Sequence, residues 1–426
     1  MYPAPSGNQG SEAELQTREL RCRLCGSALS DIFADLGSTP LCESYLSRED
    51  LMKGEPFYPL CTYVCARCFL VQVPEIVTAQ EIFSHYAYFS SYSDSWLAHA
   101  KNYVSQMVPR FGLDSRSLVV ELASNDGYLL QYFVERGVPV LGVEPAANVA
   151  EAAKKKGIPT TVEFFGEATA RKLAESGKTA DLLLGNNVLA HVPDINDFIA
   201  GMKVLLKPQG VITMEFPHLM RLVEECQFDT IYHEHFSYLS LTAVRTAFEA
   251  HGLAVFDVEE LPTHGGSLRI FAGHSEDSSK RVSARVTGLL SREEEAGVRS
   301  AEYYAGFAAK VKETKRKLLR CLIAIKRSGK SIAAYGAAGK GNTLLNYCGI
   351  RTDFIDYVVD RSAFKQGKYL PGTRIPIFAP ERIRETRPDY VLILPWNLRR
   401  EITDQLAYIR EWGGKFIVPI PSAHIV

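Results

Sequence analysis

Short apolar runs alternate with amphipathic segments through the middle of the chain. The apolar runs are rich in valine, leucine and isoleucine, which is typical of buried strands, and the segments between them carry apolar residues at helical spacing. Strands are expected at residues 118–122, 139–143, 159–162, 180–184 and 211–216, and helices at residues 96–111, 146–156, 167–175 and 196–206. Repeated strand–helix units predict a mostly parallel, doubly wound sheet.

The same alternation returns in the last third of the chain. A long charged helix is expected at residues 299–328, and an apolar run at 331–335 then leads into a loop of small residues. Further strands are expected at residues 355–359, 390–394 and 415–420. We therefore predict an α/β fold with two Rossmann-like domains, because a single core rarely grows to 426 residues.

Composition narrows the range of functions. The net charge is −1, so no basic excess points to nucleic acid or to an anionic membrane. The longest apolar runs are far too short to span a bilayer, and residues 1–16 are expected to form a polar, disordered tail that lacks the apolar core of a signal peptide. Nine cysteines without an export signal lead us to expect a cytoplasmic protein whose thiols bind metal or pack in the core.

Two Cys-x-x-Cys pairs stand near the N-terminus, and they consist of Cys22, Cys25, Cys65 and Cys68. A two-residue spacer lets both thiolates of a pair reach one ion, and two pairs complete a tetrahedral zinc site. Cys42 and Cys61 lie between the pairs and are rival ligands. We expect a structural zinc module at residues 17–75, because four thiolates leave no open position for catalysis. The alternative is four buried thiols without a metal.

A strand, a tight turn of small residues and the start of a helix follow one another at residues 118–133. Such a turn lets a ligand approach the backbone, and the helix start offers unpaired N–H groups. A dinucleotide site would have three glycines here, whereas only Gly127 is present. Glu121 would repel a pyrophosphate, whereas Glu121 and Asp126 suit S-adenosylmethionine, which carries a sulfonium and an ammonium group and no phosphate.

Glu144 ends the next apolar run, where a carboxylate can accept hydrogen bonds from ribose hydroxyls. A dinucleotide fold places an acid at a similar point, so Glu144 alone does not identify the cofactor. The turn resembles motif I of Rossmann-like methyltransferases, with Ala123 and Asn125 where many of them have glycine, and asparagine tolerates a positive φ. A strand–turn–helix unit without a ligand is the alternative. The expected cofactor-binding residues are Glu121, Ala123, Asn125, Asp126, Gly127, Glu144, Pro145, Phe165, Asn186 and Asn187.

Four ionisable residues stand in a row at Tyr232, His233, Glu234 and His235. A metalloprotease motif needs two histidines four positions apart on a helix, and here they are two apart, so that interpretation fails. In an extended segment His233 and His235 would face the same side, and in a helical turn the grouping would differ; the sequence leaves both open. An imidazole titrates near neutral pH and can remove a proton from a carbon that a neighbouring carbonyl acidifies.

These motifs are specific when they are taken in order: Cys-x-x-Cys twice, Glu-Leu-Ala-Ser-Asn-Asp-Gly, Gly-Val-Glu-Pro, Asn-Asn-Val-Leu-Ala-His-Val-Pro-Asp and Tyr-His-Glu-His-Phe. With them the chain resembles the sugar C-methyltransferases, which act on nucleotide-linked 4-keto-deoxysugars in the making of branched antibiotic sugars. The resemblance covers nearly the whole chain after the tail. It implies a zinc module, a methyltransferase domain at residues 76–255 and a Rossmann-like domain at residues 256–426. It also implies that His235 is the base and that the sugar pocket is lined by Tyr86, His191, Tyr232 and Glu234.

A second loop of small residues lies at 336–342, before a predicted helix. Gly339 and Gly341 would let a phosphate approach the backbone, and Lys340 adds a positive charge. The loop lacks the Gly-Lys-Ser/Thr ending of a Walker A motif, and a second Rossmann unit without a ligand is the alternative. The resemblance implies that this domain holds the nucleotide sugar, usually linked to thymidine diphosphate (dTDP). The expected substrate-binding residues are Gly339, Lys340, Gly341, Asn342, Asp360, Lys365 and Trp396.

Together these observations predict an S-adenosylmethionine-dependent C-methyltransferase. His235 would remove the proton beside the ketone, and His191 or Tyr86 would donate to the enolate oxygen. The expected position is C3 of a dTDP-4-keto-2,6-dideoxyhexose or its 3-amino analogue, with C5 of a dTDP-4-keto-6-deoxysugar as the alternative. Two other classes remain, an O- or N-methyltransferase and a zinc-module protein without activity. We expect a monomer that binds neither nucleic acid nor membranes.

Overall fold

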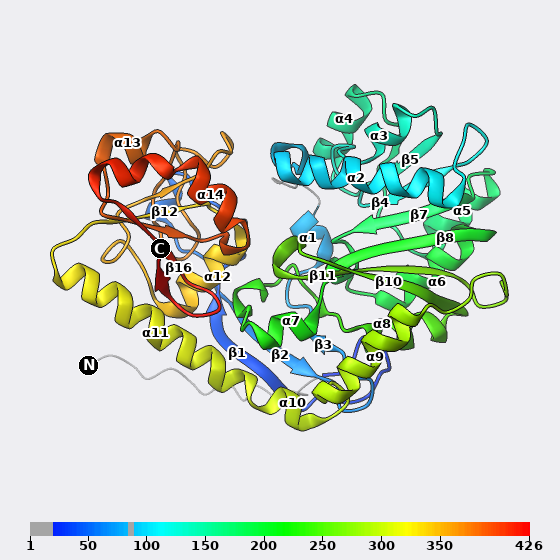
Figure 1. Ribbon diagram of the computed structural model, residues 1–426, viewed down its shortest axis with the longest axis horizontal. Helices are drawn as coiled ribbons and strands as arrows, with labels where there is room; N and C mark the ends of the chain where they lie inside the picture. Colours follow the sequence, from blue (N-terminus) through cyan, green and yellow to red (C-terminus); the bar gives the residue numbers. More distant parts are fainter. Residues whose placement is uncertain (1–19, 84–88) are drawn as a thin grey trace, which may run out of the picture.

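The computed structural model describes residues 20–83 and 89–426. Its strands form three sheets of four, seven and six strands. In Figure 1 the seven-stranded sheet lies on the right and the six-stranded sheet on the left, with the strands of the N-terminal module between and below them. The chain is therefore a mixed α/β protein with two large sheets and one small one, as the sequence predicts.

The N-terminal module is built on an antiparallel sheet in the order β1–β2–β3–β9. The strands are β1 (Asp31–Thr39), β2 (Tyr58–Val64), β3 (Val71–Gln72) and β9 (Ser237–Tyr238). The last strand comes from a distant part of the sequence, because Val71 pairs with Tyr238 and Gln72 with Ser237. The module is thus joined by a strand to the segment that carries His235.

The central sheet has the order β10–β11–β8–β7–β4–β5–β6. Its strands are β4 (Val119–Leu122), β5 (Val140–Val143), β6 (Thr160–Thr161), β7 (Ala180–Asn186), β8 (Leu206–Pro217), β10 (Leu253–Leu261) and β11 (Ser267–His274). Neighbouring strands from β6 to β8 are parallel, and β11 runs antiparallel to both β8 and β10. The order reverses beside β4, and ligands collect at such a switch point in open α/β sheets.

Helices cover both faces of the central sheet. They are α2 (Asp94–Phe111), α3 (Leu130–Val134), α4 (Ala147–Lys155), α5 (Glu167–Glu175), α6 (Ile195–Leu205) and α8 (Leu241–Ala250). Side chains alternate between the faces, since Leu182 and Leu184 join one core with α2 and α3, and Leu183 joins another with α5, α6 and α8. Packing on both faces explains why these strands read as continuous apolar runs.

The division expected between residues 255 and 256 falls inside β10. Both β10 and β11 pair within the central sheet, so this sheet continues as far as His274. The alternation of strands and helices in the sequence does not reveal this antiparallel hairpin, because its two strands are joined by a short loop rather than by a helix. That loop, Thr263–Gly265, lies next to the candidate site.

The C-terminal domain carries a sheet in the order β14–β13–β12–β15–β16–β17. Its strands are β12 (Ile332–Tyr335), β13 (Val358–Val359), β14 (Ile377–Phe378), β15 (Tyr390–Ile393), β16 (Lys415–Val418) and β17 (His424–Ile425). Its helices are α12 (Gly339–Cys348), α13 (Arg382–Thr386) and α14 (Arg399–Gln405). The first five strands are parallel in order, which is the expected Rossmann-like plan.

Helices also connect the three parts. They are α1 (Ala79–Phe83), α7 (Leu219–Glu224), α9 (Ala284–Ala296), α10 (Ala301–Ala305) and α11 (Phe307–Arg327). The long helix α11 runs along the lower left of Figure 1 and packs on β1, where Phe307 stacks on Phe33 with ring centroids 4.3 Å apart. One buried cluster includes side chains from the module, α7, α11 and the C-terminal sheet. No helix in the described part of the chain is long and apolar enough to cross a membrane.

Candidate active site and metal centre

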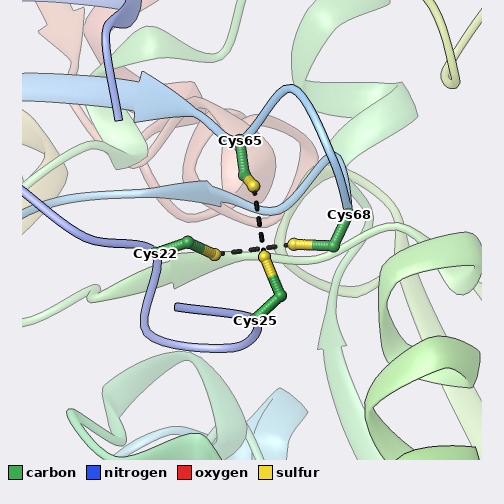
Figure 2. A group of neighbouring side chains, drawn as sticks. All are labelled: Cys22, Cys25, Cys65 and Cys68. Atoms are coloured by element: carbon green, nitrogen blue, oxygen red, sulfur yellow. Dashed lines mark hydrogen bonds between the residues drawn. The ribbon is translucent and has the colours of Figure 1, made fainter. Parts of the chain in front are cut away.

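The four paired cysteines converge as the sequence predicts (Figure 2). Their sulfur atoms all lie within 4.8 Å of one another, and the sulfurs of Cys22 and Cys68, like those of Cys25 and Cys65, are 3.5 Å apart. In a tetrahedral site with Zn–S bonds of about 2.3 Å, sulfurs are about 3.8 Å apart, so the cluster fits zinc. The rival ligand Cys42 lies elsewhere, with its sulfur 3.4 Å from Oε1 of Glu234.

Polar groups around the cluster favour thiolates. Gln72 donates from Nε2 to the sulfur of Cys22 over 3.2 Å, and the Arg67 amide lies 3.4 Å from the sulfur of Cys65. Gln72 also accepts from the backbone amide of Arg23 through Oε1. Because Gln72 lies on β3, it connects the metal centre to β9 and the segment that precedes it.

The turn after β4 has the backbone that a ligand-binding loop requires. Ala123, Asn125 and Gly127 have φ angles of 51°, 51° and 74°, all in the left-handed region. A Cβ on Gly127 would lie 2.8 Å from Cγ1 of Ile158, so only glycine fits there. The Asn125 side chain accepts from the Ser90 amide, which ties the turn to the segment before α2.

Three carboxylates lie at this edge of the sheet, as the sequence predicts. Glu144 accepts hydrogen bonds from the backbone amides of Asn125 and Ala146, over 2.9 and 2.8 Å. Asp126 pairs with Lys156 over 2.9 Å, a partner that the sequence pattern does not identify. Glu121 is buried, and its burial raises the pKa of the carboxyl well above its usual range.

Several buried polar atoms at the same edge have no hydrogen-bond partner within the described residues. They are Oε2 of Glu121, Oδ1 of Asp126, Oγ of Ser124 and both side-chain polar atoms of Asn186. Asn187 beside them has a φ of 56°. Phe165 packs edge-on against Phe198 with centroids 5.2 Å apart and remains partly exposed. Such unpaired groups are costly unless a ligand satisfies them, so they indicate a binding site.

The segment 232–235 forms a tight turn, in which the His235 amide donates to the Tyr232 carbonyl over 3.0 Å. The two histidines therefore diverge. His233 lies 3.0 Å from the Pro59 carbonyl through Nε2 and packs against Tyr58 of the module. His235 points to the other side, and its Nδ1 donates to the Thr230 carbonyl over 2.8 Å. Of the two patterns left open by the sequence, the turn holds and the extended strand does not.

His235 lies in a cluster of aromatic and imidazole rings. Its centroid is 4.0 Å from that of Tyr232 and 4.7 Å from that of His191. Burial lowers the pKa of His235 well below its usual range and lowers that of His191 to about 4. Both imidazoles are therefore neutral at physiological pH. Tyr86, the remaining expected pocket residue, lies outside the described residues.

The small-residue loop of the C-terminal domain faces the same segment. Lys340 donates to Oδ1 of Asn397 over 2.7 Å and lies 4.9 Å from the Trp396 ring centroid. Trp396 donates from Nε1 to Oδ2 of Asp229 over 2.7 Å, and Asp229 is fully buried just before Thr230. Lys340 and Trp396 are thus next to the His235 segment, together with Asp229 and Asn397. Asp229 precedes Tyr232 by three positions and Asn397 follows Trp396, but no residue pattern predicts a role for either of them.

The other expected substrate residues make hydrogen bonds or close packing contacts within the protein. Asp360 accepts from the backbone amides at 337 and 362, and Lys365 donates to the carbonyl at 337 over 2.7 Å. Asn342 donates to the Cys42 carbonyl. A Cβ on Gly339 would lie 3.0 Å from the sulfur of Cys42, and one on Gly341 would lie 2.9 Å from Leu394. Both glycines are therefore explained by close packing in this structure.

Comparison with known proteins identifies the family. Residues 22–83 match the family model of a zinc binding domain, residues 96–258 that of a methyltransferase domain, and residues 262–421 that of a C-methyltransferase C-terminal domain. The chain is 38% identical to C-methyltransferase NovU of Streptomyces niveus over 405 residues. The aligned region covers 95% of this chain and 96% of that protein. The chain belongs to the C-methyltransferase family.

More distant relatives match this C-methyltransferase only in part. Ubiquinone biosynthesis O-methyltransferase of Bartonella bacilliformis is 30% identical over 95 residues, which is 22% of this chain and 38% of that protein. The solved structure of magnesium protoporphyrin IX methyltransferase from Synechocystis, with bound S-adenosylmethionine, covers 43% of this chain and 82% of its own, with 16% identity and a TM-score of 0.32.

Membership of the family agrees with the geometry of the two sites. The C-methyltransferase uses S-adenosylmethionine, and the unpaired buried atoms of Glu121, Asp126 and Asn186 fit a ligand with cationic and polar groups. It also carries a structural zinc ion, and the cluster of Cys22, Cys25, Cys65 and Cys68 has the thiols and the spacing to hold it. Both predicted cofactors are confirmed.

Proposed function

We propose that this C-methyltransferase methylates a ring carbon beside the ketone of a nucleotide-linked 4-keto-deoxysugar, with His235 as the base. The observation that carries the proposal is the tautomer of His235. Its Nδ1–H donates to the Thr230 carbonyl, so in the neutral ring Nε2 holds a lone pair. His235 as a whole residue is only partly buried.

The reaction divides proton removal from carbon–carbon bond formation. His235 takes the proton from the carbon that the ketone acidifies, and the electron pair moves into an enolate. Burial lowers the pKa of His235, so the ring is unprotonated and ready to accept this proton at neutral pH. When bound, S-adenosylmethionine supplies the methyl group from its sulfonium, and the enolate carbon displaces the thioether. The sugar gains one methyl group and loses one proton, which His235 holds.

The hydrogen bonds of His191 suggest a different task from enolate stabilisation. The ring donates to the Glu234 backbone, and the buried Nδ1 has no partner within the described residues. The bond to Glu234 therefore starts from Nε2, and Nδ1 of the neutral ring can only accept. We propose that Nδ1 accepts from a sugar hydroxyl or amine, which leaves donation to the enolate oxygen to Tyr86.

Lys340 is the cation that suits the nucleotide diphosphate. It forms none of the ion pairs within 4 Å in the described part of the chain, and burial lowers the pKa of its ammonium. We propose that the diphosphate lies beside Lys340 and Trp396. The sugar would then extend toward His235, because Asp229 connects Trp396 with the segment that carries this base. C3 of a dTDP-4-keto-2,6-dideoxyhexose is the proposed position, and C5 the alternative.

The test is mass spectrometry of dTDP-4-keto-6-deoxysugars and their 2-deoxy forms, incubated with the enzyme and S-adenosylmethionine in deuterated water. We expect one added methyl group, and deuterium at the carbon beside the ketone when S-adenosylhomocysteine replaces the methyl donor. His235→Asn should lower both reactions by roughly 100-fold or more, because a general base contributes about this much. A methyl group on oxygen or nitrogen, or full exchange in His235→Asn, would contradict the proposal.

A further inference from the structure

The loop between β10 and β11 brings one more histidine to the site. His264 has φ and ψ of 57° and 16°, in the left-handed region that costs most residues energy. The two residues after it are Gly265 and Gly266, with φ of 94° and 113°. The two glycines adopt positive φ readily, so the conformational cost of the loop falls on His264. Such backbone persists only where its surroundings hold it in place.

Neighbours hold this loop on several sides. The Gly265 carbonyl accepts from Nε2 of Gln227 over 2.7 Å, and the Gly266 carbonyl accepts from the His218 amide over 3.0 Å. A Cβ on Gly265 would lie 2.7 Å from the Trp396 ring, which belongs to the C-terminal domain. The β10–β11 loop therefore packs between the segment that leads to His235 and the loop of Trp396, which contacts Lys340.

The side chain of His264 points back to the methyltransferase sheet. Its Nε2 lies 3.1 Å from Nδ2 of Asn187, the residue that follows β7. Its ring centroid is 5.1 Å from that of Trp96, which in turn stacks on His99. An amide nitrogen can only donate, so Nε2 of His264 accepts and the ring proton is on Nδ1. Burial and the charge of Lys340 lower the His264 pKa to about 3, which keeps the ring neutral.

The Nδ1–H of His264 is a donor without an acceptor among residues 20–83 and 89–426, and the residue as a whole is only partly buried. Its side chain contacts Asn187 at the end of β7, and its loop packs against Trp396, which lies beside Lys340. We propose that His264 is a substrate-binding residue whose Nδ1–H donates to an oxygen of the nucleotide sugar. This inference rests on the function proposed above. The sugar is favoured over the methyl donor because the loop packs against Trp396.

Two substitutions separate the donor from the shape of the side chain. His264→Leu keeps bulk and removes the donor, whereas His264→Gln retains a donor and an acceptor. Neither residue is β-branched, so both meet a similar cost in the left-handed backbone. His274→Leu is the matched control: it lies at the other end of β11, where Nε2 contacts the Leu206 carbonyl. We expect His264→Leu to raise KM for the nucleotide sugar about tenfold, since one lost hydrogen bond is worth about 1.4 kcal/mol.

Steady-state kinetics with both substrates, melting temperature and calorimetric affinity for thymidine diphosphate decide the matter. We expect His264→Leu to keep its melting temperature and its KM for S-adenosylmethionine, and His264→Gln and His274→Leu to stay within about threefold of the native enzyme. An equal loss of affinity for thymidine diphosphate would place the oxygen on the diphosphate, and an unchanged one would place it on the sugar. An unchanged sugar KM in His264→Leu, or a rise confined to S-adenosylmethionine, would overturn the inference. No methylation by the native enzyme would instead overturn the proposed function.

Discussion

Ionisable side chains at the site share one physical property, which is that burial suppresses their charge. The pKa values of His191, His235 and His264 are all lowered, and that of the Asp229 carboxyl is raised to about 6, in each case mainly by burial. Groups perturbed in this way cluster at functional sites. Each neutral imidazole can accept one proton and can donate one. This property suits the removal of a proton from carbon better than side chains whose charge is fixed.

The effect of burial on the Asp229 carboxyl can be measured through the pH dependence of folding stability. Its folded-state pKa of about 6 exceeds the usual 3.8, so the folded state retains the proton that the unfolded state releases. The carboxyl therefore stabilises the fold fully below pH 3.8, and this contribution is lost as pH rises to about 6. We expect Asp229→Asn to gain about 3 kcal/mol relative to the native enzyme between pH 3 and pH 7. The measurement is urea unfolding of both proteins at several pH values.

The difference between the two proteins isolates Asp229 from the other carboxylates, some of which shift the opposite way, as Glu215 and Glu293 do. Asparagine keeps an acceptor for Nε1 of Trp396, so the hydrogen bond that Trp396 donates can persist. Parallel stability curves for the two proteins would show that Asp229 titrates normally and would contradict the burial argument.

At the scale of elements, apolar runs predict strands correctly where helices pack on both faces of the sheet. β4, β5 and β7 lie where their apolar runs indicate, because helices cover both faces of the sheet. The convergence of the four paired cysteines is equally predictable, since a two-residue spacer lets both thiolates of a pair reach one ion. The sequence does not decide the conformation of residues 232–235, because histidines two positions apart fit an extended segment as well as a tight turn. His264 escaped prediction because only the folded loop brings it to Asn187.

Two glycines in helices test how packing decides the cost of a side chain. Gly201 on α6 is buried where that helix crosses α5, and a Cβ there would lie 2.8 Å from the backbone of Gly166. Gly288 on α9 is exposed, and a Cβ there meets no heavy atom within 4 Å. We expect Gly201→Ala to destabilise the fold by about 1–3 kcal/mol and Gly288→Ala to stabilise it by about 0.5–1 kcal/mol. Chemical unfolding measures both, and equal shifts would show that helix propensity outweighs packing.

Across the whole molecule, the zinc module and the base are mechanically joined. Gln72 contacts the sulfur of Cys22 and pairs with Ser237 in β9, two residues after His235. His233 contacts the Pro59 carbonyl of the module, and Glu234 contacts the sulfur of Cys42. The turn that carries the base therefore has module contacts on both sides, whereas the turn after β4 is held by Glu144, Lys156 and the Ser90 amide. Metal binding should thus position the base without building the cofactor edge.

Removal of zinc should separate these two functions. In Cys22→Ser, a lost ligand should loosen β3 and β9, so we expect deuterium exchange into the ketosugar to fall at least tenfold. Affinity for S-adenosylmethionine should stay within about threefold, because the carboxylates expected to bind it lie on β4, directly after β5 and in the turn between β4 and α3. Cys61→Ser is the matched control, since Cys61 lies on β2 outside the ligand set. Metal content, calorimetric affinity and exchange rate are measured for each variant. Zinc-free protein with native exchange would show that the module is not needed to position His235, and a parallel loss of cofactor affinity would show that the whole chain unfolds with the metal.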